Sequence, residues 1–227
     1  MRDHVQAAYY PFANLAAEDD LLVDAAYWSK LYGNDSSAQF KQRTSYVDAY
    51  QTSYDSNAYA YSGYTPPGAN YSARIQYTGK SGAGGSFKHL VMVRAASTGA
   101  NAFSAYLGGL YYTNSPVSWK LQIYKCVNGS TLSLLAETAS TANVPPEMGL
   151  RIEVHDDDSS NIQLALYRNE TDPAVLTASD ADVSKITAKG QAGIYHQTGD
   201  ERHYYDDFYI YVGILPVIEQ HYRRLRT

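Results

Sequence analysis

The sequence predicts an all-β protein that folds as an antiparallel β-sandwich. Apolar and polar residues alternate with period two in many segments, turn signals separate these segments, and helical periodicity is scarce. The length of 227 residues suits one sandwich domain. Because 44% of the residues are hydrophobic and 18% are charged, the composition is that of a globular chain that can bury a core.

Four segments show the alternation most clearly, and each has three apolar residues separated by mostly polar ones. Successive side chains of a strand point to opposite faces, so each triplet faces one side of its strand. We therefore expect four half-buried antiparallel strands with the triplets in the core. The triplets are Ala73, Ile75 and Tyr77; Trp119, Leu121 and Ile123; Leu150, Ile152 and Val154; and Ile162, Leu164 and Leu166.

Residues typical of turns separate these segments. Pro66–Pro67–Gly68 and Pro145–Pro146 precede predicted strands, and the glycine-rich run at 81–86 joins two more. Asn128–Gly129 is a strong signal for a β-hairpin, and the polar run HDDDSSN at 155–161 predicts a turn between two strands. This spacing predicts roughly eleven to thirteen strands.

Little of the chain predicts helix. Residues 15–33 show some helical periodicity and predict either a short helix or a loop. Residues 179–188 predict a short helical turn, which Ser179 or Asp180 could cap.

No linker divides the chain, so we expect one domain over residues 1–215. Residues 216–227 form a basic tail that contains Arg223, Arg224 and Arg226. The tail could anchor the chain to an acidic partner, although such tails are more often solvated.

Charge and cysteine content limit the classes of partner and the compartment. The net charge of −5 and the isoelectric point of about 5.6 predict no nucleic-acid binding, which normally needs a basic face. No apolar run is long enough to cross a bilayer, so we expect no membrane insertion. The N-terminal MRDHVQAAYYPF lacks the apolar stretch of a secretory signal, and the single cysteine, Cys126, cannot form an internal disulfide. We therefore expect folding in a reducing cytoplasm.

Tyrosine is unusually frequent, with 23 residues against 5 phenylalanines and 2 tryptophans. A buried hydroxyl needs a partner, so a core alone would be built better from other apolar residues. The excess predicts surfaces that are both apolar and hydrated, as protein interfaces and sugar-binding sites are, whereas ordinary sheet packing is the alternative for any single tyrosine. The candidate ligand-binding or interface residues are Tyr209, Tyr211, Tyr124, Tyr167 and Tyr195.

Three stretches resemble a known superfamily. AAEDDLLVDAAYWSKLYGN (16–34), GLRIEVHDDDSSNIQLALYRN (149–169) and KGQAGIYHQTGDERHYYDDFYIYVG (189–213) are similar to the opening, central and closing strands of concanavalin A-like lectin/glucanase domains. The likeness is strongest to the laminin-G-like domains of bacterial and phage surface proteins, and it spans about residues 12–213. The resemblance implies a jelly-roll β-sandwich of two curved sheets.

The resemblance also suggests a role for Asp206. In this superfamily the last strand lies beside the first, and the matching aspartate points inward and fixes the N-terminal segment through backbone N–H groups or a calcium ion. Parity agrees, because Asp206 shares a face with Phe208 and Ile210, opposite the two tyrosines of the same strand. Calcium is the candidate cofactor, with Asp206, Asp19 and Asp20 as candidate ligands. A carboxylate satisfied by backbone donors without metal is the alternative.

The resemblance predicts no hydrolase. Laminarinase-type members have a strand that reads Glu, hydrophobic, Asp, two further residues, Glu. The nearest match begins at Glu153, but His155 replaces the middle aspartate and Asp158 replaces the second glutamate. Because an aspartate is one methylene shorter, an acid at this place would be misplaced for glycoside hydrolysis. We expect a protein that is not an enzyme, with a glycoside hydrolase as a distant alternative.

These observations predict a structural or interaction protein of a bacteriophage-like virion, such as a decoration, fibre or tail component. Such a protein is made in the host cytoplasm and acts on the virion, which would explain an adhesion-type fold without a secretion signal. Its partners would be other virion proteins or copies of itself, together with a host-surface glycan. A free carbohydrate-binding module or adhesin is the alternative.

Overall fold

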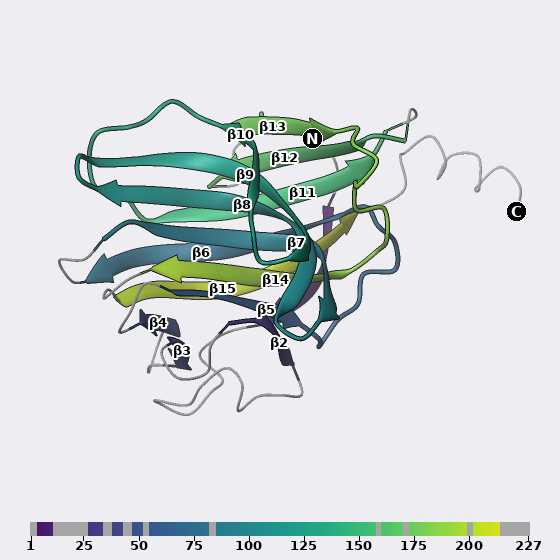
Figure 1. Cartoon of the computed structure of the whole chain (residues 1–227), viewed down its shortest axis with the longest axis horizontal. Coiled ribbons are helices and arrows are strands. Elements are labelled where there is room, and N and C mark those ends of the chain that lie inside the picture. The colour runs from purple at the N-terminus through teal and green to yellow at the C-terminus, as the bar shows by residue number, and fades with distance from the viewer. Residues whose placement is uncertain are drawn as a thin grey trace, which may run out of the picture.

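The structure, a computed structural model, describes residues 4–10, 27–33, 38–42, 47–51, 55–81, 85–157, 160–169, 173–198 and 202–213. These residues form two antiparallel sheets that stack face to face as a sandwich (Figure 1). The all-β sandwich predicted from the alternation is therefore confirmed.

Sheet A contains eight strands within the described ranges, and the first and last described strands are neighbours in it. Its strands, in spatial order, are β13 (Leu176–Asp180), β12 (Ile162–Arg168), β11 (Met148–Asp156), β6 (Tyr71–Ser81), β15 (Arg202–Gly213), β4 (Val47–Gln51) and β3 (Ala38–Gln42), with β1 (His4–Tyr10) also paired to β15.

Sheet B contains seven strands in the same part of the chain. They are, in spatial order, β10 (Ser133–Glu137), β9 (Val117–Gly129), β8 (Ala102–Asn114), β7 (Phe87–Gly99), β14 (Gln191–Thr198), β5 (Asp55–Tyr61) and β2 (Trp28–Tyr32). Both β14 and β15 insert between strands from the first half of the chain, so the chain crosses repeatedly between the sheets.

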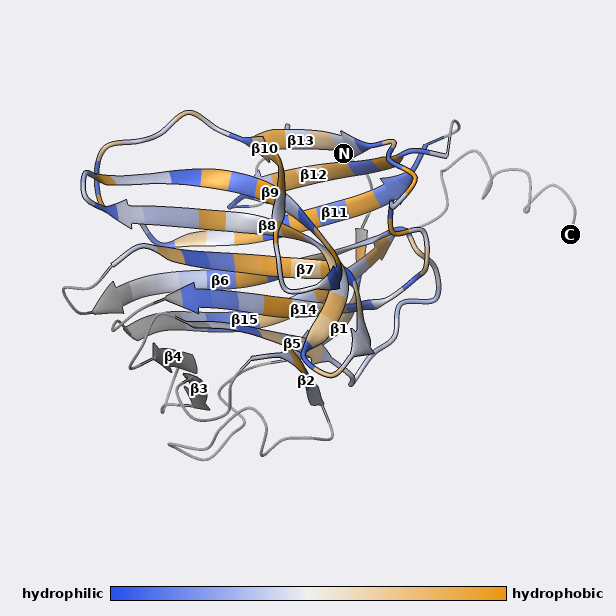
Figure 2. Cartoon of the chain, viewed as in Figure 1, coloured by the Kyte–Doolittle hydropathy of each residue, from blue (hydrophilic) through white to orange (hydrophobic). Residues whose placement is uncertain are grey.

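The core lies between the two sheets. All four predicted apolar triplets lie in it, with exposed fractions from 0 to 7%. Figure 2 shows the corresponding alternation of apolar and polar residues along the strands. The predicted core faces of the four strands are confirmed. The opposite faces are less open than predicted, because Gln122 on β9 and Arg151 and Glu153 on β11 are also buried.

Strands β9 and β10 pair as the predicted hairpin, but Asn128 and Gly129 are the last residues of β9 and not a two-residue turn. Asn128 has a positive φ of 49°, a conformation that asparagine tolerates better than most residues. The polar turn between β11 and β12 closes through a hydrogen bond from Asp157 N–H to Asn161 O of 2.9 Å.

The segment 179–188 differs from its prediction. Strand β13 continues to Asp180, and a single turn follows, in which Lys185 N–H donates to Asp182 O over 3.1 Å. Asp180 Oδ1 accepts the N–H of Asp182 over 3.1 Å, so a local side-chain hydrogen bond competes with helix formation. Within segment 15–33, the described residues 27–33 contain strand β2.

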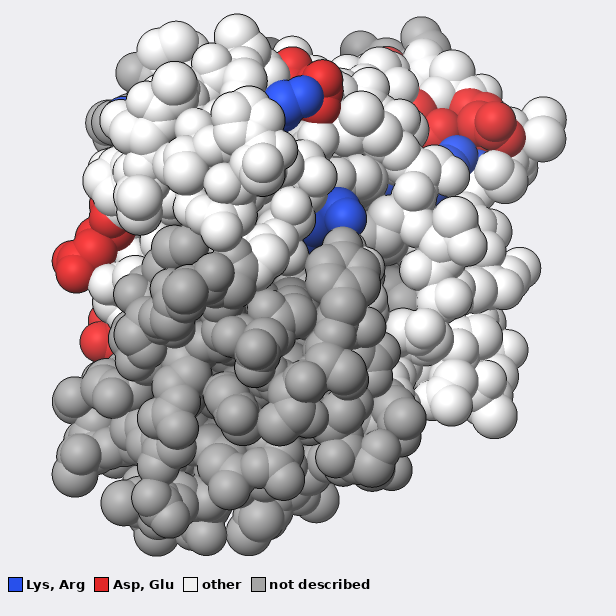
Figure 3. All heavy atoms as spheres, turned by 60° about the vertical axis from the view of Figure 1, so that its left-hand side comes forward, with Lys and Arg blue, Asp and Glu red and all other residues white. Residues whose placement is uncertain are grey.

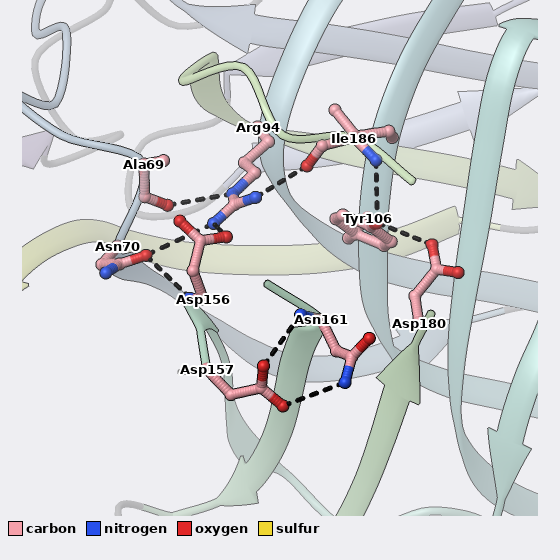
Figure 4. Close-up of polar contacts among 9 residues, drawn as sticks. All are labelled: Ala69, Asn70, Arg94, Tyr106, Asp156, Asp157, Asn161, Asp180 and Ile186. Atoms are coloured by element: carbon pink, nitrogen blue, oxygen red, sulfur yellow. Dashed lines mark hydrogen bonds and ion pairs between the residues drawn. The ribbon is translucent and has the colours of Figure 1, made fainter. Parts of the chain in front are cut away.

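A buried arginine ties three segments together at one end of the sandwich (Figure 4). The side chain of Arg94, on β7, has no exposed surface. Its guanidinium donates to Ala69 O over 3.0 Å and to Ile186 O over 2.7 Å, and it forms an ion pair of 2.9 Å with Asp156. A further contact reaches Asn70 Oδ1 at 3.3 Å. The guanidinium thus holds the loop before β6, the end of β11 and the loop after β13.

An ion pair with both side chains buried joins the two sheets. Lys125, on β9 of sheet B, lies 3.0 Å from Asp180, at the end of β13 of sheet A, and their side chains are only 9% and 3% exposed. The Tyr106 hydroxyl donates to the same carboxylate over 2.7 Å and accepts the N–H of Ile186 over 2.9 Å. Because the carboxylate has both a cation and a hydroxyl donor, its burial is compensated.

A pair of histidines lies inside the core. His196 on β14 and His89 on β7 are direct cross-strand partners, and each is 1% exposed. Their Nδ1 atoms lie 2.9 Å apart, and the Tyr205 hydroxyl lies 2.8 Å from His196 Nδ1. Burial lowers the pKa of His196 to about 3, because the charged imidazolium would lose its hydration.

The face drawn in Figure 3 has no large patch of described residues with charge of one sign. On that face acidic and basic side chains are few, and most of the described surface is uncharged. Among the residues that the structure describes, no helix is long and apolar enough to span a membrane.

Candidate functional site

Strands β1 and β15 are antiparallel neighbours, as expected for the first and last strands. The first strand is His4–Tyr10, however, and it lies upstream of the segment 16–34 that resembles the superfamily's opening region. The strand within that segment, Trp28–Tyr32, belongs instead to sheet B, where it pairs with β5. The first and last described strands therefore meet in sheet A, and the segment that resembles the opening region contributes to sheet B.

Strand β15 contains a β-bulge at Asp207, and the bulge corrects the predicted orientation of Asp206. Asp206 pairs with Gln76, whereas the next paired residue is Phe208, which is fully buried in the core. The extra residue, Asp207, has a positive φ of 47° and shifts the two-residue period by one. The prediction that Asp206 points inward is therefore wrong: Asp206 lies half-buried on the outer face, the same face as Tyr209.

Five directly paired residues form a row across five strands of sheet A. Cross-strand pairing places their side chains on one face, about 4.5–5.5 Å apart. We call these residues the Tyr–Arg row: Tyr9 on β1, Tyr209 on β15, Arg74 on β6, Arg151 on β11 and Tyr167 on β12.

One end of the row is a stack of tyrosines around a carboxylate. The rings of Tyr9 and Tyr209 are stacked with centroids 4.8 Å apart, and Tyr211 continues the stack 6.0 Å from Tyr209. The Tyr9 hydroxyl donates to Asp207 Oδ1 over 2.6 Å, and the Tyr209 hydroxyl donates to Asp207 Oδ2 over 3.2 Å. Tyr9 is 42% exposed, so this end of the row is open to solvent.

The carboxylates alter the acidity of their neighbours. The hydrogen bond to Asp207 raises the pKa of the Tyr9 hydroxyl well above its ordinary value. Burial, followed by the charge of Asp207, raises the pKa of Tyr209, and the same two causes raise the pKa of the Asp206 carboxyl. Both hydroxyls therefore stay protonated at neutral pH and remain hydrogen-bond donors.

Arg74 sits in the middle of the row. Its guanidinium carbon lies 5.3 Å from the Tyr209 ring centroid, and Nη2 donates to Gln76 Oε1 over 2.8 Å. The guanidinium also lies over Gly149, where an added Cβ would come within 2.7 Å of Nη2. The glycine therefore leaves the space that the guanidinium occupies.

The other end of the row is packed. The Arg151 guanidinium carbon lies 3.8 Å from the Tyr167 ring centroid. Nη1 of the same guanidinium forms an ion pair of 3.3 Å with Glu153. The side chains of Arg151 and Glu153 are only 9% and 6% exposed. The open part of the row is thus at Tyr9, Tyr209 and Arg74.

The structure separates the five predicted tyrosines. Tyr209, Tyr211 and Tyr167 are half-exposed on the outer face of sheet A. Tyr124 and Tyr195 lie in sheet B, within an apolar cluster, and are only 6% and 3% exposed. Of the five, Tyr209 and Tyr211 stack together at the open end of the row, whereas Tyr167 lies at its packed end.

The predicted calcium ligands and the anchoring tail are only partly described. Asp19 and Asp20 lie outside the described residues, as do Arg223, Arg224 and Arg226. Within the residues that are described, no group of three or more His, Cys, Asp or Glu side chains is arranged to hold a metal ion. Calcium binding and tail anchoring stay predictions.

Of the two carboxylates considered for hydrolysis, the structure describes only Glu153. Its carboxylate is buried and paired with Arg151, which lies 3.3 Å away. Asp158 lies outside the described residues.

Three residues at the open end of the row were not predicted from the sequence: Tyr9, Arg74 and Asp207. Tyr9 and Arg74 join the site through cross-strand register, which the sequence does not give. The sequence does contain a signal for the bulge at Asp207: two adjacent carboxylates interrupt the alternation of an otherwise apolar strand.

No protein-family model and no curated protein sequence matched the chain. Solved structures do match it along most of its length. The catalytic domain of an endo-1,3-β-glucanase (laminarinase) from Thermotoga petrophila RKU-1 matches at a TM-score of 0.56 and 9% identity, covering 95% of this chain and 100% of the other. The metal-free carbohydrate recognition domain of Emp46p matches at 0.58 and 10% identity, covering 91% and 97%.

A phage protein is also similar. The CBM2 module of the evolved Dit of Lactobacillus casei BL23 phage J-1 matches at a TM-score of 0.55 and 12% identity, covering 94% of this chain and 99% of the module. At such identities the likeness establishes the fold alone. The chain thus has the concanavalin A-like lectin/glucanase fold, and the resemblance that the sequence indicated is confirmed at that level.

Proposed function

We propose that the chain is a non-enzymatic carbohydrate-binding protein and a structural component of a bacteriophage-like virion. The observation that supports carbohydrate binding most is the exposed tyrosine stack with a carboxylate and a guanidinium beside it. Aromatic rings offer apolar contact to a sugar ring. Asp207 can accept a hydrogen bond from a sugar hydroxyl, and Arg74 can donate one to a sugar hydroxyl. An apolar surface with a few oriented polar groups is the usual chemistry of a small-ligand site.

The fold supports the same proposal, because lectins, glucanases and a phage carbohydrate-binding module share it. We place the chain among the binding proteins because Glu153 is buried in an ion pair and because the hydrolase motif is altered at His155 and Asp158. The similarity to a phage Dit module favours the virion setting over a free adhesin.

We expect Tyr209→Ala and Tyr211→Ala to weaken binding to a glycan-array ligand at least tenfold, or about 1.4 kcal/mol. Removing either ring removes part of the stack, and a half-exposed ring contributes less to folding than a buried one. The measurement is titration calorimetry against the array ligand, with thermal melts to check folding.

Tyr111→Ala is the matched control, since Tyr111 is a half-exposed tyrosine in sheet B, next to Lys88 rather than in the row. Its affinity should equal that of the wild type. If all three variants bind equally well, the site is not the tyrosine stack. The virion setting is tested separately by asking whether flanking genes encode capsid, portal or tail proteins.

A further inference from the structure

The β-bulge of β15 places the Asp207 carboxylate at the open end of the Tyr–Arg row. Asp207 is the inserted residue, and its positive φ of 47° is unusual for a residue other than glycine. A regular strand would alternate Asp206 and Asp207 between the two faces, whereas here Asp206 pairs with Gln76 on the outer face and Asp207 contacts Tyr9 and Tyr209 on that same face. Bulges of this kind commonly re-aim a side chain beside a binding site.

The carboxylate of Asp207 is fixed but not saturated. Each of its oxygens accepts one phenolic hydroxyl, from Tyr9 at 2.6 Å and from Tyr209 at 3.2 Å. A carboxylate has about four acceptor positions, so about two remain for a ligand. Arg74 lies across the Tyr209 ring and supplies donors from the neighbouring strand. A hydroxyl placed between them can donate to Asp207 and accept from Arg74.

The charges of this face do not favour an anion. The arginines of the row are Arg74 and Arg151, and Arg151 is already paired with Glu153. Among the described residues, Asp206 and Asp207 lie beside the open end, so two carboxylates accompany the single guanidinium of Arg74 there. An acidic sugar would be repelled there, whereas an uncharged sugar would use both the donor and the acceptors.

We infer that the open end of the Tyr–Arg row binds an uncharged oligosaccharide through neighbouring hydroxyls, and that Asp207 is the residue that determines this specificity. This inference rests on the proposed carbohydrate-binding function. The open part of the row, from Tyr9 to Arg74, spans three strands, or about 10 Å at the usual strand spacing, which is longer than a single sugar ring.

The test compares Asp207→Asn with Asp206→Asn, which removes the same charge from the adjacent residue on the same face. Asparagine tolerates a positive φ, so the bulge should persist, and thermal melts verify this. The probes are neutral gluco-, manno- and galacto-oligosaccharides and, as the acidic counterpart, oligogalacturonate. We expect Asp207→Asn to weaken the best neutral ligand about tenfold and Asp206→Asn to change its affinity less than about twofold. Affinity should vary little between about 50 and about 500 mM NaCl.

Tighter binding of oligogalacturonate than of every neutral probe, or tighter binding by Asp207→Asn, would overturn the inference while leaving carbohydrate binding in place. Equal weakening by both variants would also overturn it, because the effect would then be one of general charge. If no probe binds and Tyr209→Ala behaves like the wild type in every assay, the proposed function itself fails.

Discussion

Replacing Arg94 with methionine is expected to lower the free energy of unfolding by about 2–4 kcal/mol. Methionine keeps much of the apolar stem but has no donors. The carbonyl oxygens of Ala69 and Ile186, which now accept from the guanidinium at 3.0 and 2.7 Å, would lose that donor. A buried acceptor left without a donor costs about 1–3 kcal/mol, and these two residues are half-buried, so each should cost about 1–2 kcal/mol. Asp156 adds less, because its side chain is 42% exposed and can be hydrated.

The measurement is urea denaturation of the wild type and of Arg94→Met, with Lys120→Met as the matched control. Lys120 also forms an ion pair, 3.0 Å from Glu137, but both side chains are substantially exposed, at 29% and 38%. Such exposed pairs contribute about 0–1 kcal/mol, so the control should stay close to the wild type. Similar losses in both variants would mean that burial does not distinguish the two cations and that the Arg94 contacts do not hold the loops.

The strands could be predicted because burial on one side of a sheet leaves a direct record in the sequence. Ile75, Leu121 and Ile152 alternate with polar residues, and all three lie in the core. The hairpin of β9 and β10 could be predicted for an equally local reason, since Asn128, at the end of β9, tolerates the positive φ found there. Both signals depend only on near neighbours in the chain.

The orientation of Asp206 could not be predicted by the same rule, because a bulge breaks the period on which the rule depends. Parity assigned Asp206 to the face of Phe208, but the residue inserted between them reverses that assignment. The prediction of a short helical turn over residues 179–188 was wrong for a related reason. There Asp180 bonds to the N–H of Asp182, and a local hydrogen bond prevails over helical propensity.

The site itself depends on register between strands that are far apart in sequence. Tyr9 and Tyr209 stack because β1 pairs with β15, and Arg74 joins them because β6 pairs on the other side. The sequence indicated that tyrosine would form a surface, but it could not assign Tyr124 and Tyr195 to a different sheet. Composition gives the chemistry of such a surface, and only the topology gives its members.

Acidification is expected to destabilise the protein through His196, by about 2 kcal/mol between pH 6.5 and pH 4.5. Burial lowers the pKa of His196 from 6.5 to about 3 in the folded state. Below pH 6.5 the unfolded chain therefore binds a proton that the folded chain does not bind. Stability falls as the pH falls, at up to about 1.4 kcal/mol per pH unit, until the folded pKa is reached.

Other groups also titrate in this range, so the test is a difference between chains. His196→Gln keeps a polar side chain beside His89 and Tyr205 but cannot titrate. We expect its unfolding free energy, measured by urea denaturation, to fall about 2 kcal/mol less than that of the wild type between pH 6.5 and pH 4.5. His155→Gln, at the half-exposed end of β11, is the control and should follow the wild type. Parallel curves for the wild type and His196→Gln would mean that the imidazole takes up its proton without unfolding, and the buried histidine pair would then not limit stability in acid.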